Sequence, residues 1–124
     1  VKHLDMPLQM EFIRLSSYGS GFSTSGKVNA VDIKLPDLNG KNVLIVEDIV
    51  DTGLTAKFLM DFMHCNFNAK SIKFCSLLDK KITRKVDIEP DYYGFEVDNK
   101  FVVGYGLDYE GYYRNLRYIG YKEM

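Results

Sequence analysis

Residues 43–55, VLIVEDIVDTGLT, carry the clearest fold signal of this 124-residue chain. The stretch starts with four apolar residues without polar alternation, which is typical of a central parallel strand buried on both faces. It then passes through two acids, Glu47 and Asp48, to a third, Asp51. Apolar side chains follow at helical spacing, so a helix is expected over residues 53–66. The stretch therefore predicts a buried strand, a polar turn and a helix.

Segments with strand-like composition lie on both sides of this unit. They are residues 10–15 and 28–35 before it, and residues 72–78, 92–97, 101–105 and 118–121 after it. A strand, a helix and a strand joined by short links form a βαβ unit with parallel strands. We therefore expect a single α/β domain over residues 1–124, with a mainly parallel twisted sheet and flanking helices. The Ser- and Gly-rich residues 16–26 predict a long surface loop.

The composition narrows the classes of protein to consider. The chain is 46% hydrophobic and 27% charged, with a net charge of -1, which is typical of a globular protein. It contains no Lys/Arg block that would track a nucleic-acid backbone and no apolar run near the roughly 20 residues of a membrane span. We therefore expect neither nucleic acid nor membrane as a partner. Cys65 and Cys75 lack metal-site spacing and are expected to be reduced thiols of a cytoplasmic protein.

The polar turn contains the residues that are best suited to bind a ligand. Ligands of open α/β sheets bind at the carboxyl ends of the strands, and backbone N–H groups at the start of the following helix suit a phosphate. The Thr-Gly-x-Thr of residues 52–55 lies at that place, while Glu47 and Asp48 can accept hydrogen bonds from vicinal hydroxyls or lie near Mg²⁺. A simpler alternative is a helix cap beside a solvated acidic turn. The combination with Asp51 favours a sugar-phosphate site.

The same stretch resembles the phosphoribosyl pyrophosphate (PRPP) binding motif of type I phosphoribosyltransferases, and its form is most similar to that of the hypoxanthine-guanine phosphoribosyltransferases. Further blocks match in the same order, namely residues 12–18, 76–81, 90–95 and 100–109. The resemblance covers residues from about 10 to about 116. It implies the type I fold and a purine salvage transferase of the glycosyltransferase class. Such an enzyme moves a 5-phosphoribosyl group from PRPP to hypoxanthine or guanine, giving IMP or GMP and pyrophosphate.

The resemblance implies roles for the residues that bind PRPP. Glu47 and Asp48 would bind the ribose hydroxyls and support Mg²⁺, and Asp51 would exchange a proton with N7 of the purine. The 5′-phosphate would bind to Asp51, Thr52, Gly53, Leu54 and Thr55. Arg114 would contact pyrophosphate. Ser17 and Tyr18 would belong to a mobile lid that closes over the reacting centre.

The resemblance also implies a site for the purine base. Lys80 would reach the exocyclic oxygen of a 6-oxopurine and so select hypoxanthine or guanine over adenine. Phe101 would stack on the purine, and the backbone of Val102 would read the edge of the base. Asp108 would bind Mg²⁺ and lie near the base.

The chain departs from the family pattern at its N-terminus. Family members have an earlier strand and a loop, typically Leu-Lys-Gly-Gly, that contacts pyrophosphate, and residues 1–9 contain nothing similar. We therefore expect the C-terminal two-thirds or so of the family domain, with the N-terminal strand and loop missing and apolar edges exposed. Because members of this family are commonly dimers or tetramers, the resemblance implies a homo-oligomer.

Two other functions remain open. The chain could be a non-catalytic regulator that binds PRPP or nucleotide, or an inactive fragment, and the missing pyrophosphate loop favours this reading. It could also be a nucleotide-binding α/β protein with unrelated chemistry. Retention of Asp51, Lys80 and Asp108 together favours the enzyme, because a sensor needs no proton-transfer acid.

Overall fold

The computed structural model describes residues 1–17, 28–32 and 34–123. The chain divides into two compact units, Val1–Asp37 and Leu38–Met124. The single domain expected from the sequence stays a prediction.

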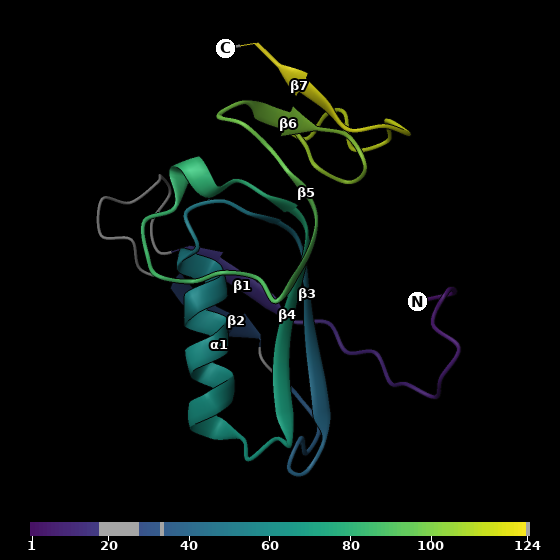
Figure 1. Ribbon diagram of the computed structural model, residues 1–124, viewed down its shortest axis with the longest axis vertical. Coiled ribbons are helices and arrows are strands. Elements are labelled where there is room, and N and C mark those ends of the chain that lie inside the picture. The colour runs from purple at the N-terminus through teal and green to yellow at the C-terminus, as the bar shows by residue number, and fades with distance from the viewer. Residues whose placement is uncertain (18–27, 33, 124) are drawn as a thin grey trace. The chain divides into compact units, whose positions relative to one another are not determined.

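A three-stranded parallel sheet forms the centre of the larger unit. Its strands are β3 (Asn42–Val50), β4 (Ser71–Asp79) and β5 (Tyr92–Glu96), in the order β3-β4-β5 (Figure 1). Helix α1 (Leu54–Asn66) connects β3 to β4 and lies beside the sheet. The expected strand–helix–strand unit and parallel sheet are thereby confirmed, although the described residues contain one α-helix rather than several.

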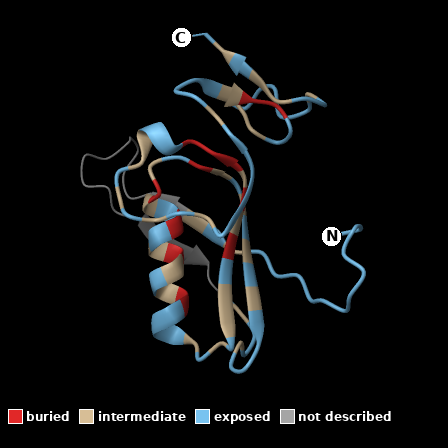
Figure 2. Ribbon diagram, in the orientation of Figure 1, coloured by how far each residue is buried: buried red, intermediate tan, exposed pale blue. Residues whose placement is uncertain are grey.

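The core lies between α1 and the sheet. Val50, Ala56 and Phe74 form a buried cluster, against which Ile45, Met60 and Ile88 pack. The buried residues of α1 are Ala56, Leu59 and Met63, and their spacing of three and four residues places them on one face of the helix. Figure 2 shows this buried face toward the sheet and further burial at the carboxyl end of β4. Packing therefore anchors the end of β3, where the polar turn begins.

The expected burial of residues 43–46 on both faces is wrong. Within the described sheet, β3 is an edge strand, and its burial alternates along the strand. Leu44 is 51% exposed and Val46 is 69% exposed. Successive side chains of a strand point to opposite faces, and α1 covers only one of them. An apolar run shows that both faces can be buried, but it does not show what covers them.

The smaller unit contains an antiparallel pair of strands, β1 (Arg14–Ser17) and β2 (Val28–Asp32). The strand expected over residues 10–15 begins only at Arg14, because β1 is ordered by pairing with β2 and the pairing starts there. Phe12 is accordingly 82% exposed. The second strand ends at Asp32 rather than at residue 35. Most of the expected loop falls on residues 18–27, outside the described residues.

The C-terminal part of the larger unit holds a second antiparallel pair, β6 (Phe101–Val103) and β7 (Gly120–Lys122). Strand β6 ends earlier than residue 105 because the backbone turns at Gly104, which has a φ of 94°. A Cβ at Gly104 would lie 2.1 Å from the carbonyl oxygen of Tyr118. Only glycine fits this close approach of two backbone segments.

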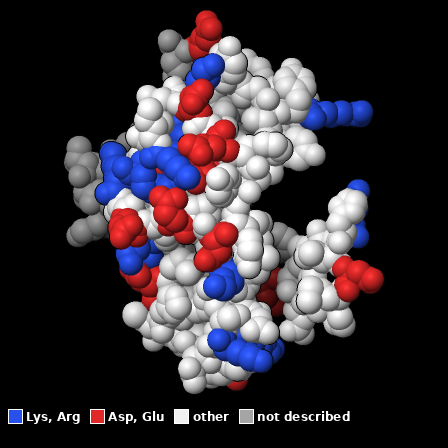
Figure 3. Space-filling model, viewed as in Figure 1, with Lys and Arg blue, Asp and Glu red and all other residues white. Residues whose placement is uncertain are grey.

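Charged side chains of both signs lie next to one another on the face shown in Figure 3. On α1, Lys57 Nζ lies 3.0 Å from Asp61 Oδ1. This mixture agrees with the net charge of -1. Within the described part of the chain, no helix is long and apolar enough to cross a membrane.

Candidate active site

The turn between β3 and α1 depends on a glycine. Gly53 is the N-cap of α1 and has a φ of 86°, in the left-handed region. A Cβ at this position would lie 2.7 Å from Ile88 Cγ2 and 2.8 Å from Arg84 Cδ. The segment after β4 therefore packs directly on the backbone of the turn, and a side chain at position 53 would push it away.

A cavity of about 240 Å³ opens at this turn. Its lining residues are Glu47, Asp48, Ile49, Val50, Asp51, Thr52, Gly53, Thr55 and Ala56. The three acids of the motif thus share one space with the start of α1. The first N–H groups of a helix have no partner within the helix, and they carry the positive end of its dipole. An anionic group and a polyhydroxyl group can bind here side by side.

The structure supports only in part the simpler interpretation that the turn serves as a helix cap. Thr52 Oγ1 accepts a hydrogen bond from the N–H of Leu54, with a long distance of 3.3 Å. The N-cap itself is Gly53, and no side chain caps it. A helix built only for stability favours Ser, Thr, Asp or Asn at its N-cap. The glycine instead leaves the start of α1 open.

Glu47 and Asp48 form the acidic side of the cavity. Glu47 is half-buried, whereas Asp48 is exposed and accepts a hydrogen bond of 2.7 Å from the N–H of Ile49. Burial of the Glu47 carboxyl, and secondly the neighbouring Asp48 carboxylate, raise the pKa of Glu47 above its ordinary value of 4.5. A bound cation or a hydroxyl donor would relieve both effects. The charge and position of Glu47 therefore suit a ligand.

The chemistry of the acid pair also fits Mg²⁺. This ion usually takes one or two protein carboxylates and completes its shell with water and substrate phosphates. Among the described residues, no three His, Cys, Asp or Glu side chains gather into a group that could hold a metal ion. Asp108 therefore does not join Glu47 and Asp48 in one cluster. The pair could hold Mg²⁺ together with water and the phosphate oxygens of a ligand.

Asp51 is held by the segment that follows β4. Thr83 Oγ1 donates a hydrogen bond to Asp51 Oδ1, and Arg84 Nε donates one of 3.1 Å to the carbonyl oxygen of Asp51. The N–H of Lys85 donates to the carbonyl oxygen of Thr52 at 2.8 Å. The amino-acid sequence predicts none of these contacts. Nothing in the local pattern of Thr83 indicates them.

An ion pair at the end of β4 anchors the same segment. Asp79 is fully buried, and Arg84 Nη2 pairs with its Oδ1. The Arg84 guanidinium also donates to the carbonyl oxygen of Ile88 and lies 3.3 Å from Glu89 Oε1. Sequence reasoning missed this pair too. The signal was an acid at the carboxyl end of the strand that follows the motif.

Lys80, the expected selector of the 6-oxopurine, is 8% exposed. Its N–H donates a hydrogen bond of 2.9 Å to the carbonyl oxygen of Val50, so the start of the segment after β4 lies beside the end of β3. The structure therefore brings Lys80 next to the turn, although Lys80 is not among the residues that line the cavity.

The other expected base-binding residues lie on and after β6. Phe101 is 38% exposed and packs edge-to-face on Tyr109, with 5.5 Å between the ring centroids. Val102 is half-buried and pairs with Tyr121 of β7. Neither residue lines the cavity at the turn.

Asp108 and Arg114, expected near Mg²⁺ and pyrophosphate, contact each other. Arg114 Nη2 lies 3.2 Å from Asp108 Oδ1, and the N–H of Gly111 donates to Asp108 Oδ2 at 2.8 Å. Arg114 Nη1 also donates to the carbonyl oxygen of Gly106 at 2.7 Å. Of the expected lid residues, Ser17 ends β1 and Tyr18 lies outside the described residues.

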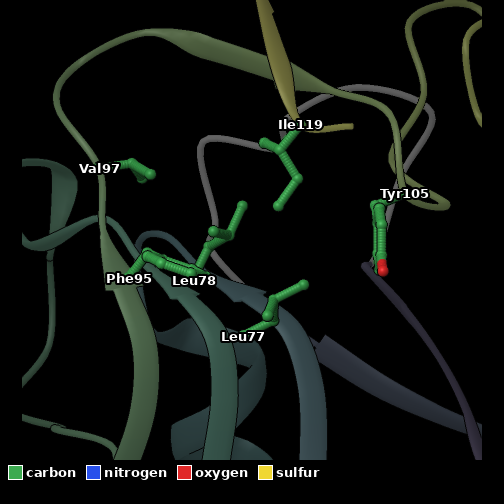
Figure 4. Close-up of a pocket in the computed structure, with 6 residues that line it drawn as sticks. All are labelled: Leu77, Leu78, Phe95, Val97, Tyr105 and Ile119. Atoms are coloured by element: carbon green, nitrogen blue, oxygen red, sulfur yellow. The ribbon is translucent and has the colours of Figure 1, made fainter. Parts of the chain in front are cut away.

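A larger cavity of about 430 Å³ lies away from the acids. Figure 4 shows its lining side chains, which are Leu77, Leu78, Phe95, Val97, Tyr105 and Ile119. They include no carboxylate, imidazole or amine and offer a single hydroxyl. Size alone would favour this cavity, but the groups that can bind phosphate and move protons line the smaller one.

Comparisons with known proteins agree with this geometry. The family model described as "Phosphoribosyl transferase domain" matches residues 1–110. The hypoxanthine-guanine phosphoribosyltransferase of Bacillus subtilis is 48% identical over 97% of this chain, and that of Streptococcus pneumoniae strain R6 is 50% identical over 97%. The crystal structure of a hypoxanthine phosphoribosyltransferase from Staphylococcus aureus matches 98% of this chain with a TM-score of 0.90 and 40% identity.

This chain spans 66% of the length of each of these three proteins. The likeness extends from the family model to the sequence and the fold, and residues 1–110, which the family model matches, contain the strand–turn–helix unit. The chain belongs to the phosphoribosyltransferase domain family.

Proposed function

We propose that the natural protein that carries this chain transfers a 5-phosphoribosyl group from PRPP to hypoxanthine or guanine, giving IMP or GMP and pyrophosphate. The observation that carries this proposal is the cavity at the turn after β3. There, carboxylates suited to ribose hydroxyls and the start of a helix suited to a phosphate share one space. The names of the relatives support hypoxanthine and guanine as the bases.

On the PRPP side, the 5′-phosphate binds the backbone of residues 51–55, with Asp51, Thr52, Gly53, Leu54 and Thr55 contributing. Glu47 and Asp48 accept hydrogen bonds from the ribose hydroxyls. Mg²⁺ would supply positive charge to the pyrophosphate when bound. Glu47 and Asp48 would hold it on the ribose side, and Asp108 would bind Mg²⁺ separately, on the base side. Arg114 contributes a further positive charge to the leaving pyrophosphate, and Ser17 and Tyr18 exclude water as a lid.

On the base side, Lys80 donates to the exocyclic oxygen, Phe101 stacks, the Val102 backbone reads the base edge, and Asp108 lies nearby. The bond from C1 of the sugar to pyrophosphate breaks as a bond from C1 to N9 of the purine forms. The pyrophosphate leaves with the electron pair of its bond to C1, and the Asp51 carboxylate accepts the proton of N7, so that the base in the product is neutral. The residues contribute mainly by holding both reactants in line and by neutralising charge.

An assay of product formation from hypoxanthine, guanine and adenine, each with PRPP and Mg²⁺, tests the proposal. We expect IMP and GMP and little AMP. A preference for adenine would contradict the role of Lys80. Tight binding of GMP without turnover would instead support the non-catalytic regulator. A mass measurement of the same sample by light scattering tests the proposed homo-oligomer, and a cytoplasmic location stays a prediction from the resemblance.

A further inference from the structure

The segment after β4 contacts both the carboxylate and the backbone carbonyl of Asp51. The hydroxyl of Thr83 donates to Oδ1 of the carboxylate, and Nε of Arg84 donates to the carbonyl oxygen of the same residue at 3.1 Å. We propose that Thr83 is a positioning residue, which binds one oxygen of the Asp51 carboxylate and leaves the other, Oδ2, to exchange the proton of the purine. This inference rests on the proposed function.

Thr83 is itself well placed for this task. It ends the short 3-10 helix η1 (Lys81–Thr83), and its hydroxyl also lies 3.1 Å from the carbonyl oxygen of Lys80. A hydroxyl has one proton to donate, and an ionised carboxylate is a stronger acceptor than a carbonyl. The Asp51 carboxylate is therefore the preferred partner, and the Lys80 carbonyl keeps the hydroxyl in reach of it.

Arg84 makes the support rigid. Its side chain is 10% exposed and is tied to Asp79, which is fully buried at the end of β4. The position of the Thr83 backbone is thus set by the sheet that carries the active-site turn. Hydrogen bonds to both the backbone carbonyl and the carboxylate of Asp51 leave the carboxylate little freedom to rotate. A group that is held in its reacting geometry lowers the activation barrier without tighter substrate binding.

The different roles of Oδ1 and Oδ2 of Asp51 follow from their hydrogen bonds. Among the described residues, Oδ1 of Asp51 accepts a side-chain hydrogen bond and Oδ2 has none. If Oδ1 keeps its partner during the reaction, Oδ2 is the atom that exchanges the proton with N7. Loss of the hydroxyl would free the carboxylate to rotate, so fewer bound substrates would meet it in the reacting geometry.

Kinetics of the natural protein test the proposal. Thr83→Val removes the hydroxyl at nearly constant volume and is expected to lower kcat about tenfold, the effect of one hydrogen bond to a charged group. The KM for PRPP should stay within about twofold. Thr83→Ser restores the hydroxyl and should restore kcat. The matched control is Ile82→Ala, in the same turn, whose side chain is 69% exposed and makes none of these contacts.

A readout independent of turnover separates this inference from the proposed function. The ¹³C signal of the Asp51 carboxyl, assigned by its loss in Asp51→Asn, should move in Thr83→Val and stay in place in Ile82→Ala. The positioning role alone would be overturned if the protein is active but the Asp51 signal does not move in Thr83→Val. The same holds if Thr83→Ser does not restore kcat. An unaltered protein without turnover would overturn the proposed function, and the role of Thr83 in catalysis with it.

Discussion

Gly53 and Glu47 each carry a local cost to folding in the turn after β3. Gly53 has a φ of 86°, and Glu47 places a carboxyl in a half-buried position beside another acid. Costs of this kind gather at functional sites, because binding requires conformations and charges that folding alone would not select. Substitutions at both residues should therefore change the stability of the fold and the function of the site in different ways, which can be measured.

Gly53→Ala should be more harmful than an alanine at another glycine of similar conformation. We expect a loss of about 2–4 kcal/mol in the free energy of unfolding, from backbone strain and from the clash of Cβ with Ile88 and Arg84. Gly40→Ala is the matched control, since Gly40 has a φ of 72° and open space around its Cβ position. It should lose only about 1–2 kcal/mol from strain. Equal losses in urea unfolding would show that the clash is absent.

Glu47→Gln should stabilise the protein at neutral pH and weaken PRPP binding. The pKa of Glu47 is raised by burial and by Asp48, so the folded protein holds this proton more tightly than the unfolded chain does. The contribution of Glu47 to stability is complete below its ordinary pKa of 4.5 and is lost as pH rises through the raised value. The difference in Tm between variant and wild type should therefore grow from near zero at low pH. A difference that does not vary with pH would contradict this origin.

At the scale of elements, the connection after β4 acts as a brace for the turn after β3. Its hydrogen bonds reach Val50, Asp51 and Thr52 across the sheet. Strand β4 ends in the buried Asp79, which fixes Arg84 and with it the path of the connection. The connection, which contains only the short 3-10 helix η1 as regular structure, is thus anchored to the ends of β3 and β4 by hydrogen bonds and an ion pair.

Arg84→Met should destabilise the fold far more than the same kind of change on the surface. It leaves the Asp79 carboxylate buried without its partner, which costs about 3–5 kcal/mol. The control is Lys57→Met, which breaks the pair with Asp61 on α1, where both side chains are about half exposed. That change should cost about 0.5 kcal/mol or less. Chemical denaturation monitored by circular dichroism compares them, and similar midpoints would mean that the Asp79–Arg84 pair is not closed in solution.

At the scale of the whole molecule, the parallel sheet presents an apolar strand at its edge. Leu44 and Val46 of β3 are 51% and 69% exposed. Exposed strand edges with apolar side chains are prone to associate. About a third of the length of these relatives lies outside the part that matches this chain, and the exposure of β3 is that of this chain alone.

This chain should therefore associate at high concentration, and the double variant Leu44→Lys with Val46→Lys should reduce that association several-fold. Lysine on the exposed face of an edge strand disfavours strand pairing through charge and hydration. Ile82→Lys is the control, because Ile82 is as exposed as Val46, at 69%, but lies on η1 rather than on the sheet. Sedimentation velocity over a range of concentrations measures the effect. Equal reduction by both changes would point to net charge rather than to the edge of β3.

The strand–turn–helix unit, the parallel pairing of its neighbours and the residues that meet at the turn could all be predicted from the amino-acid sequence. These features are local, because an apolar run, three acids and a Thr-Gly-x-Thr start act within a dozen residues. The cavity lined by Glu47, Asp51 and Thr55 is where that pattern placed it.

Three features are visible only in the folded chain: which faces of β3 are covered, the pairing of Asp108 with Arg114, and the contacts of Thr83 and Arg84 with Asp51. Thr83 and Asp51 lie 32 positions apart in the chain, and no local period links them. Their contact exists because β3 and β4 run parallel and end at the same edge of the sheet. Long-range contacts of this kind follow from packing and register, which local sequence patterns do not encode.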